Sequence, residues 1–436
     1  MLALYFVVCG FTFGLYRLDK IITVPTPLGD LNGNDVMLAL LLLFSIPEYL
    51  RRRKEHPSPW FVRVEIAWVI LVSMLAVAAF NSVAVTLRDR FVNMRFLEPY
   101  LLFFPTVAVL KNYRRLYLCM AFGICIAVLG TALTIAQSLH GLSLLFDSSL
   151  YNIGSWGGNR GIAGGLVRVN LPISNWVAFV ILVLLAALLV RWRWWVAGLV
   201  GVLSVTIFVN LARSLWLSLL IAFVLEVALF LWEGILDLRS AVRIGLLPVV
   251  IAVALLLAPL IGLGSLGESM AGRVAEGVQN FSSGSGTWAD RMDQNAWTWR
   301  ILDEGHWLFG LGTDYQSAAG YMTDMGLPAT LLSVGLFGLV IFFAVLIVCI
   351  FGGLAGMKEG VRRDDLFAVL LGVALPAVII QRLVFQHWLY PESAGILAVA
   401  AGAALMVPYL RAELSDGSAR EDHEFEKSKP EQAVPQ

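Results

Sequence analysis

Charged residues are scarce in this sequence. They make up 14% of its 436 residues, whereas hydrophobic side chains make up 59% and the mean hydropathy is +0.79. An ordinary soluble domain has roughly 25% charged residues, so the composition excludes a soluble globular chain and predicts a polytopic membrane protein. The 31 basic and 31 acidic residues cancel, and the net charge therefore gives no reason to expect a nucleic acid as partner.

Cysteine is rare as well, and several catalytic motifs are missing. The four cysteines all fall in apolar runs without a CxxC pair, at Cys9, Cys119, Cys125 and Cys349. We therefore expect no disulfide framework, no zinc site and no cofactor. The sequence lacks a Walker A motif, which argues against an ATP-driven pump. It also lacks GxSxG, HExxH and DxD motifs, which argues against a serine hydrolase, a zincin and a metal-dependent nucleotide-sugar transferase.

Long apolar runs are abundant instead. A membrane-spanning helix needs about 20 mostly apolar residues, and this length predicts an all-α fold with about twelve spans. We place them at 1–16, 36–50, 64–87, 96–110, 116–138, 172–190, 194–211, 214–232, 244–263, 329–354, 366–386 and 392–410. The chain then divides into N-terminal helices (1–138), a first long loop (139–171), central helices (172–263), a large loop (264–328), C-terminal helices (329–410) and a disordered polar tail (411–436).

Basic clusters orient these spans, because lysine and arginine accumulate in short cytoplasmic loops. Five clusters fall on one side of the twelve-span arrangement: "RRRK" at 51–54, "KNYRR" at 111–115, "RWR" at 191–193, "DLRSAVR" at 237–243 and "KEGVRR" at 358–363. That side is predicted to be cytoplasmic, together with both termini. The two long loops are then periplasmic, and the chain is expected in a bacterial inner membrane.

The larger loop is polar and aromatic, and loops of this length usually have a function. It contains "RMDQNAWTWRILDEGHWLFGLGTDY" between Arg291 and Tyr315. Upstream, Thr287 and Asp290 have the spacing of a capping box that opens a helix. The tryptophans here are expected either at the membrane interface or stacked on sugar rings.

Arginine on the predicted outer side suggests an anionic ligand. After Lys20 the outer loops contain no lysine, and arginine is the better bidentate ligand for phosphate. The candidate diphosphate-binding residues are Arg88, Arg168, Arg213, Arg291 and Arg300. The alternative is that each arginine pairs with an acid or extends to lipid headgroups. Arg213 favours ligand binding most, because it lies between two spans.

One acidic residue, Glu226, falls inside the eighth span. It is expected either to pair with a polar group of a neighbouring helix or to couple to protons.

The order of several elements resembles the superfamily of O-antigen ligases and Wzy-type polysaccharide polymerases. The elements are "ARSLWL" at 212–217, the polar loop with Arg291 and "LFGLG", and "TDMGLPATLLSVGLFGLV", in which Gly335 and Gly338 follow Asp324. The resemblance covers about residues 150–355. Ligases of the family usually have a His-Asn pair where this chain has Asp324 and Met325, and "TDMG" is closer to the Asp-x-Gly variant of exopolysaccharide polymerases.

The resemblance implies a membrane glycosyltransferase that uses an undecaprenyl-diphosphate-linked oligosaccharide at the periplasmic face. Fixed guanidinium groups would stabilise the departing diphosphate, and a general base would take the proton of the acceptor hydroxyl. The candidate bases are Asp324 first and His306 second, and the alternative for Asp324 is a helix cap. Membrane lipids, chain-length regulators and export proteins are the other partners implied. The alternative functions are a ligase that moves glycan to another lipid or a protein, and a flippase of lipid-linked sugars.

Overall fold

The computed structural model describes fifteen helices and one short strand pair in the placed part of the chain. The placed residues are 1–13, 23–26, 30–55, 59–81, 86, 88, 90, 93–140, 173–210, 213–236, 275, 279, 282–283, 287–312, 326–385 and 393–410. The first helices are α1 (Leu2–Thr12), α2 (Gly33–Glu55), α3 (Pro59–Phe80), η1 (Met94–Leu97), α5 (Glu98–Leu101), α6 (Phe103–Val109) and α7 (Tyr113–His140). They are followed by α8 (Ile173–Val190), α9 (Trp194–Asn210), α10 (Arg213–Trp232), α13 (Thr287–Ile301), the π-helical turn η3 (Leu302–His306), α15 (Gly326–Arg362), α16 (Leu366–Phe385) and a last helix, Ser393–Leu410. Strands β1 (Thr23–Val24) and β2 (Leu31–Asn32) pair antiparallel.

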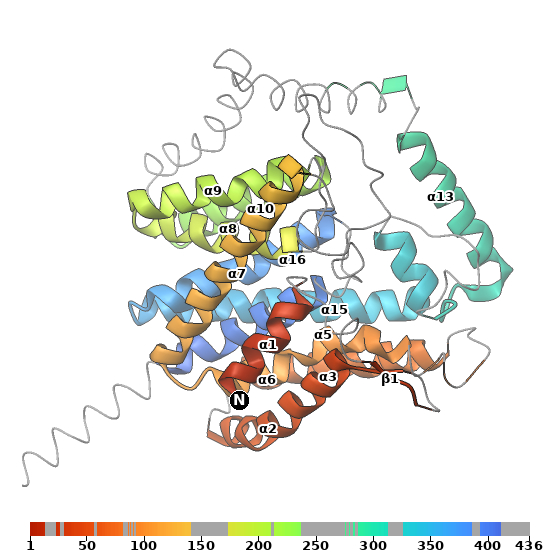
Figure 1. Cartoon of the computed structure of the whole chain (residues 1–436), viewed down its shortest axis with the longest axis horizontal. Helices are drawn as coiled ribbons and strands as arrows, with labels where there is room; N and C mark the ends of the chain where they lie inside the picture. Colours follow the sequence, from red (N-terminus) through yellow and green to blue (C-terminus); the bar gives the residue numbers. More distant parts are fainter. Residues whose placement is uncertain are drawn as a thin grey trace, which may run out of the picture.

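The all-α prediction is confirmed (Figure 1). Within the described ranges, eight helices are long and apolar enough to cross a membrane. Helices also occupy the places of the shorter predicted spans at 1–16, 96–110 and 194–211. The span at 244–263, the loop at 139–171 and the tail at 411–436 lie outside the described residues, so the number twelve stays a prediction.

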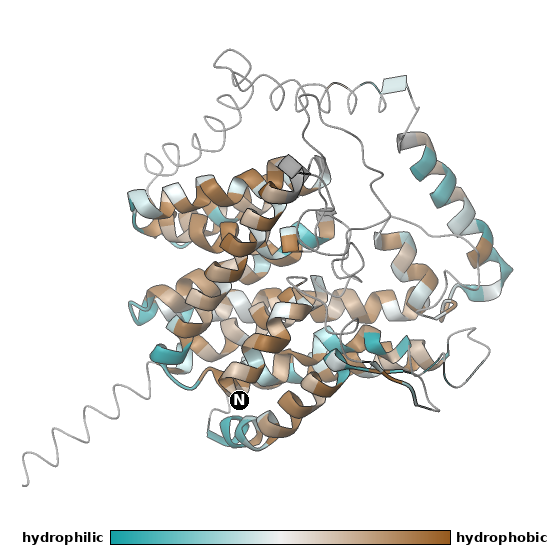
Figure 2. Cartoon of the chain, viewed as in Figure 1, coloured by the Kyte–Doolittle hydropathy of each residue, from teal (hydrophilic) through white to brown (hydrophobic). Residues whose placement is uncertain are grey.

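Burial divides the helices into a centre and a surround. Helices α8, α16 and Ser393–Leu410 are buried over most of their length, whereas α2, α3 and α10 bury one side only. The open sides are apolar, since large hydrophobic side chains such as Phe44, Val69 and Val77 are exposed on them. Apolar flanks of this extent are costly in water and suited to lipid. Figure 2 shows these hydrophobic flanks, with hydrophilic residues at the ends of the bundle and along α13.

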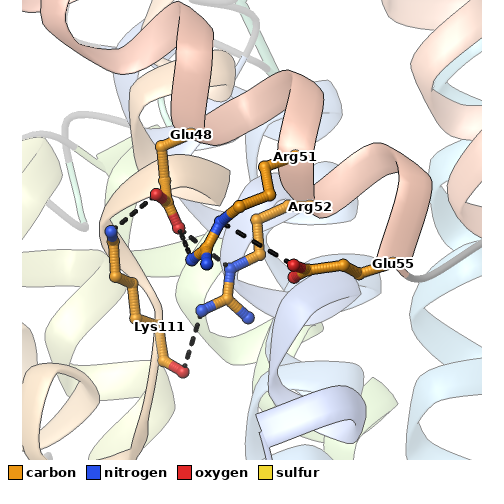
Figure 3. Close-up of polar contacts among 5 residues, drawn as sticks. All are labelled: Glu48, Arg51, Arg52, Glu55 and Lys111. Atoms are coloured by element: carbon orange, nitrogen blue, oxygen red, sulfur yellow. Dashed lines mark hydrogen bonds and ion pairs between the residues drawn. The ribbon is translucent and has the colours of Figure 1, made fainter.

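Three of the predicted basic clusters meet at one end of the bundle, which we call the basic end. Glu48, near the end of α2, forms an ion pair with Lys111, which precedes α7. The Lys111 Nζ and the Glu48 Oε2 are 2.6 Å apart. Arg52 is 3% exposed and donates to the Lys111 carbonyl at 3.2 Å (Figure 3). At the same end Lys358 of α15 pairs with Glu233 after α10 at 3.6 Å. The cluster "DLRSAVR" lies outside the described residues.

A second set of polar contacts lies at the other end, which we call the outer end. Arg95 of η1 donates to Asp35 at the start of α2, at 2.8 Å. Arg382, near the end of α16, donates to the Asn175 amide oxygen of α8 at 2.9 Å and to the Ser393 hydroxyl at 3.1 Å. These contacts join helix ends distant in sequence. The start of α15 also lies at the outer end, because its last turns, with Lys358, are at the basic end.

Candidate functional site

Helix α13 forms a separate unit at the outer end. It begins at Thr287, which confirms the helix predicted to open at "TWAD". Its last turns pack, through Trp297 and Ile301, on a small hydrophobic core that is distinct from the core of the bundle. This second core consists of Leu302, Leu311, Ala329, Leu331, Leu332 and Leu339. Figure 1 shows α13 beyond the end of the bundle at which α15 begins.

The segment 308–312, "LFGLG", is inserted into a break in α15. The break lies at Gly335, whose φ of +67° and ψ of −173° interrupt the helical conformation. A helix break leaves backbone N–H and C=O groups without their usual partners. Four hydrogen bonds between residues 307–312 and α15 replace them, two donated from each side, with N···O distances between 2.6 and 3.2 Å. They run from Leu311 N–H to Leu332 C=O, Gly312 to Ser333, Leu336 to Trp307 and Phe337 to Leu308.

Two glycines make this close approach possible. Gly310 and Gly335 both have positive φ, which side chains with a Cβ rarely adopt. A Cβ at Gly310 would lie 2.6 Å from the Leu332 carbonyl oxygen, and one at Gly335 would overlap the Leu308 carbonyl. The sequence elements "LFGLG" and Gly335, 23 residues apart at their nearest, are therefore in direct contact. We call α13, η3, residues 307–312 and residues 326–334 the α13 unit.

The two arginines of α13 point in different directions. Arg291 is three residues from the buried Gln294, whereas Arg300 is nine residues from Arg291. At about 100° per residue, Arg291 lies beside the buried face that includes Gln294 and Thr298, and Arg300 lies roughly opposite Arg291. Both side chains are exposed. A single ligand on one side of α13 can be reached by one of them and not by both.

His306 closes the turn that connects α13 to the inserted segment. It is half-buried, and its carbonyl accepts the Gly310 N–H at 3.0 Å. Gly305 before it has φ of +109°, which turns the chain back toward α15. The chain turns sharply between α13 and His306. The turn and the hydrogen bond to Gly310 together fix the position of His306 relative to the start of α15.

The tryptophans of this loop have two different roles. Trp297 packs on the second core. Trp299 and Trp307 are partly exposed and pair with each other, with ring centroids 5.2 Å apart. The Trp307 Nε1–H donates to Asp303 Oδ1 at 3.1 Å, which holds the indole in place. Asp303 was not identified as this partner from the sequence. The side chain of Trp288 lies outside the description.

Arg88 belongs to a different cluster. It is exposed and forms an ion pair with Asp30, with Nη2 and Oδ1 3.2 Å apart. Arg95 nearby donates to the Asp30 carbonyl as well as to Asp35. Arg88 therefore pairs with an acid, Asp30, which precedes α2, as the alternative to ligand binding predicted. An exposed pair of this kind stabilises little, typically below about 1 kcal/mol, so it does not prevent Arg88 from contacting an anion.

Three candidate side chains lie outside the described residues: Arg168, Asp324 and Arg213. For Arg213 the backbone is placed, as the first residue of α10. For Asp324 only the chain that follows it is placed, since α15 begins two residues later at Gly326, three residues before the predicted span at 329–354, with Pro328 in its first turn. The helix that follows "TDM" contacts "LFGLG" through Leu332 and Ser333.

Sequence reasoning missed Asn175 and Ser393 as partners of the buried Arg382. The guanidinium is 3% exposed and also donates to the Asn175 carbonyl at 3.0 Å. An arginine in an otherwise apolar span was the available signal. Its partners come from two other helices, and sequence spacing does not reveal such pairs.

Among the described residues, no group of three or more His, Cys, Asp or Glu side chains could hold a metal ion. Comparison of the chain with models of known protein families finds no match, and comparison with curated proteins finds none either. The fold defines a polytopic helical membrane protein. Its function has to be inferred from the residues and their geometry.

Proposed function

We propose that this protein is a membrane glycosyltransferase that polymerises repeat units of a surface polysaccharide. The donor is an oligosaccharide linked to undecaprenyl diphosphate, and the reaction takes place at the outer end, on the periplasmic face of a bacterial inner membrane. The basic end is cytoplasmic, as the positive-inside rule requires, and both termini lie there.

The observation that carries this proposal is the contact between "LFGLG" and the break at Gly335. The resemblance to polysaccharide polymerases rests on elements that are separate in sequence. Their contact in the structure supports the proposal that they belong to one site. Here Leu311 and Gly312 donate to Leu332 and Ser333. The same unit contains Arg291 and His306, so it supplies a cation and one candidate base, and the other candidate base, Asp324, precedes its α15 part by two residues in sequence.

The chemistry assigned to the residues follows from the charges that the reaction develops. Arg213 and Arg291 bind the diphosphate, whose negative charge grows as the glycosidic bond to it breaks. Asp324 accepts the proton of the acceptor hydroxyl, with His306 as the second candidate. Arg300 lies roughly opposite Arg291 on α13 and is assigned no contact with the same diphosphate. Arg88 and Arg168 remain secondary candidates.

The experiment that tests the function is a reaction of the purified, reconstituted protein with a lipid-diphosphate oligosaccharide, followed by gel analysis. A polymerase gives a ladder of chain lengths. A ligase gives a single new conjugate with an added acceptor. A flippase gives neither product, and it moves the lipid-linked sugar across the vesicle membrane without consuming it. Absence of any new glycosidic product under conditions that support flipping would overturn the transferase proposal.

A further inference from the structure

Glu226 is an acid in an unusual place. It lies in the half of α10 nearer the basic end and is 0% exposed. Neither of its carboxyl oxygens has a hydrogen-bond partner in the described structure. The sequence left open whether it pairs with a polar group of a neighbouring helix. No such pair forms within the part of the chain that the structure places.

The face of α10 on which Glu226 lies is the one that packs against the bundle. Every third or fourth residue along it is completely buried: Leu215, Ser218, Ala222, Glu226 and Phe230. The opposite face, with Leu217, Leu220 and Val224, is exposed and suited to lipid. Glu226 therefore points into the protein, toward α16 and α8, and it cannot reach water by extending along the outside of the helix.

The described helices that pack around Glu226 contain almost nothing that could stabilise a negative charge. Helices α8, α9 and α16 pack against α10, and in their sequences Arg382 is the one ionisable residue. Arg382 follows Gln381, whose amide donates to Ser218 at 3.3 Å, near the outer end. Glu226 lies eight residues further along α10 than Ser218, or about 12 Å. An ionised carboxylate in such an apolar interface is strongly disfavoured.

We propose that Glu226 is a proton-binding site inside the membrane, occupied in the conformation described here. The buried polar side chains of this interface, Ser174, Ser218 and Gln381, all lie between Glu226 and the outer end, which makes the outer face the side from which the proton exchanges. Release of the proton would place a negative charge where no described residue compensates it, so we expect α10 to shift when the proton leaves. Because α10 begins with Arg213, protonation of Glu226 acts on the helix that presents a candidate diphosphate ligand.

The site is tested by reaction with a hydrophobic carbodiimide, dicyclohexylcarbodiimide, on the full-length protein in membranes. A protonated carboxyl adds across one C=N bond of the reagent, its proton moves to nitrogen, and the O-acylisourea rearranges to a stable N-acylurea without a leaving group. We expect one added reagent on the peptide that contains Glu226, identified by mass spectrometry on the unmutated protein. The yield should fall as the pH is raised, since the ionised carboxyl does not react.

Glu226→Gln should abolish the modification. Glu233→Gln is the matched control on the same chain segment, because Glu233 pairs with Lys358 at the basic end, and it should leave the modification at Glu226 unchanged. Mapping on the unmutated protein keeps the test valid even if Glu226→Gln fails to fold. The proposal is overturned if Glu226 is modified only after denaturation, or if its modification does not change with pH, which would make it a permanently neutral structural acid. Neither result bears on the transferase reaction, which has its own assay.

Discussion

At the scale of single residues, the two arginines of α13 provide an internal comparison. Arg291 lies beside the buried face of the helix and Arg300 roughly opposite it. Lysine keeps the charge but loses the bidentate geometry of guanidinium. We expect Arg291→Lys to lower the rate of polymer formation at least tenfold and Arg300→Lys to leave it near the wild-type rate, with equal amounts of protein in the membrane. A larger loss in Arg300→Lys would place the ligand on the other side of α13.

Arg213→Lys belongs to the same comparison but tests a different helix. Arg213 is the first residue of α10 and precedes an apolar span. If it binds the diphosphate together with Arg291, its loss should raise the concentration of lipid-linked donor needed for half-maximal rate as well as lower the rate. Wild-type behaviour of both lysine variants would exclude a diphosphate clamp made by these residues.

One substitution distinguishes the two possible roles of Asp324, general base and helix cap. Asparagine accepts backbone N–H groups nearly as well as aspartate, so the start of α15 at Gly326 should be preserved. It cannot act as a general base, and loss of such a base typically costs about a hundredfold to ten-thousandfold in rate. Asp324→Asn should therefore insert normally and fail to polymerise. Polymer of normal length from this variant would leave Asp324 as a cap and make His306→Gln the decisive variant.

At the scale of elements, the contact between "LFGLG" and α15 should be intolerant of any side chain. Alanine at Gly335 must adopt a positive φ, at a cost of about 1–2 kcal/mol, and its Cβ overlaps the Leu308 carbonyl. We expect Gly335→Ala and Gly310→Ala each to lower the free energy of unfolding of the α13 unit by more than that amount. Thermal unfolding in detergent and limited proteolysis between α13 and α15 would measure the loss.

The matched control is Gly198→Ala in α9. A Cβ at Gly198 meets nothing within 4 Å, and alanine is favoured over glycine inside a helix by roughly 0.5–1 kcal/mol. This variant should be neutral or slightly more stable. If Gly335→Ala behaved like Gly198→Ala, the insertion of 308–312 into α15 would not be a fixed part of the structure.

At the scale of the whole molecule, the polar contacts at the two ends predict a definite orientation. Lys111 and Lys358 are both at the basic end, and α13 is at the outer end. A reporter inserted near Gly284 should register as periplasmic, and one fused after Lys358 as cytoplasmic. A cytoplasmic signal at Gly284 would place the α13 unit on the wrong side for a lipid-linked donor that is presented in the periplasm.

The sequence by itself determined the class of fold and the approximate positions of the described long apolar helices. Span length and hydropathy follow from the thickness and polarity of the membrane, which act on each segment separately. For that reason α8 and α16 could be placed to within a few residues. The same holds for the side on which the basic clusters lie, because charge in short loops is a local property.

Only the tertiary structure decided which residues meet. The insertion of 308–312 into the break at Gly335, the second core under α13 and the pairing of Arg88 with Asp30 all join segments distant in sequence. Hydrophobic periodicity reports burial but not the partner, since any apolar surface of the right shape satisfies it. The carboxyl of Glu226 also shows what packing decides, although here packing supplies no described partner. The sequence showed that an acid lay within the span, and packing alone determined that it faces the protein interior.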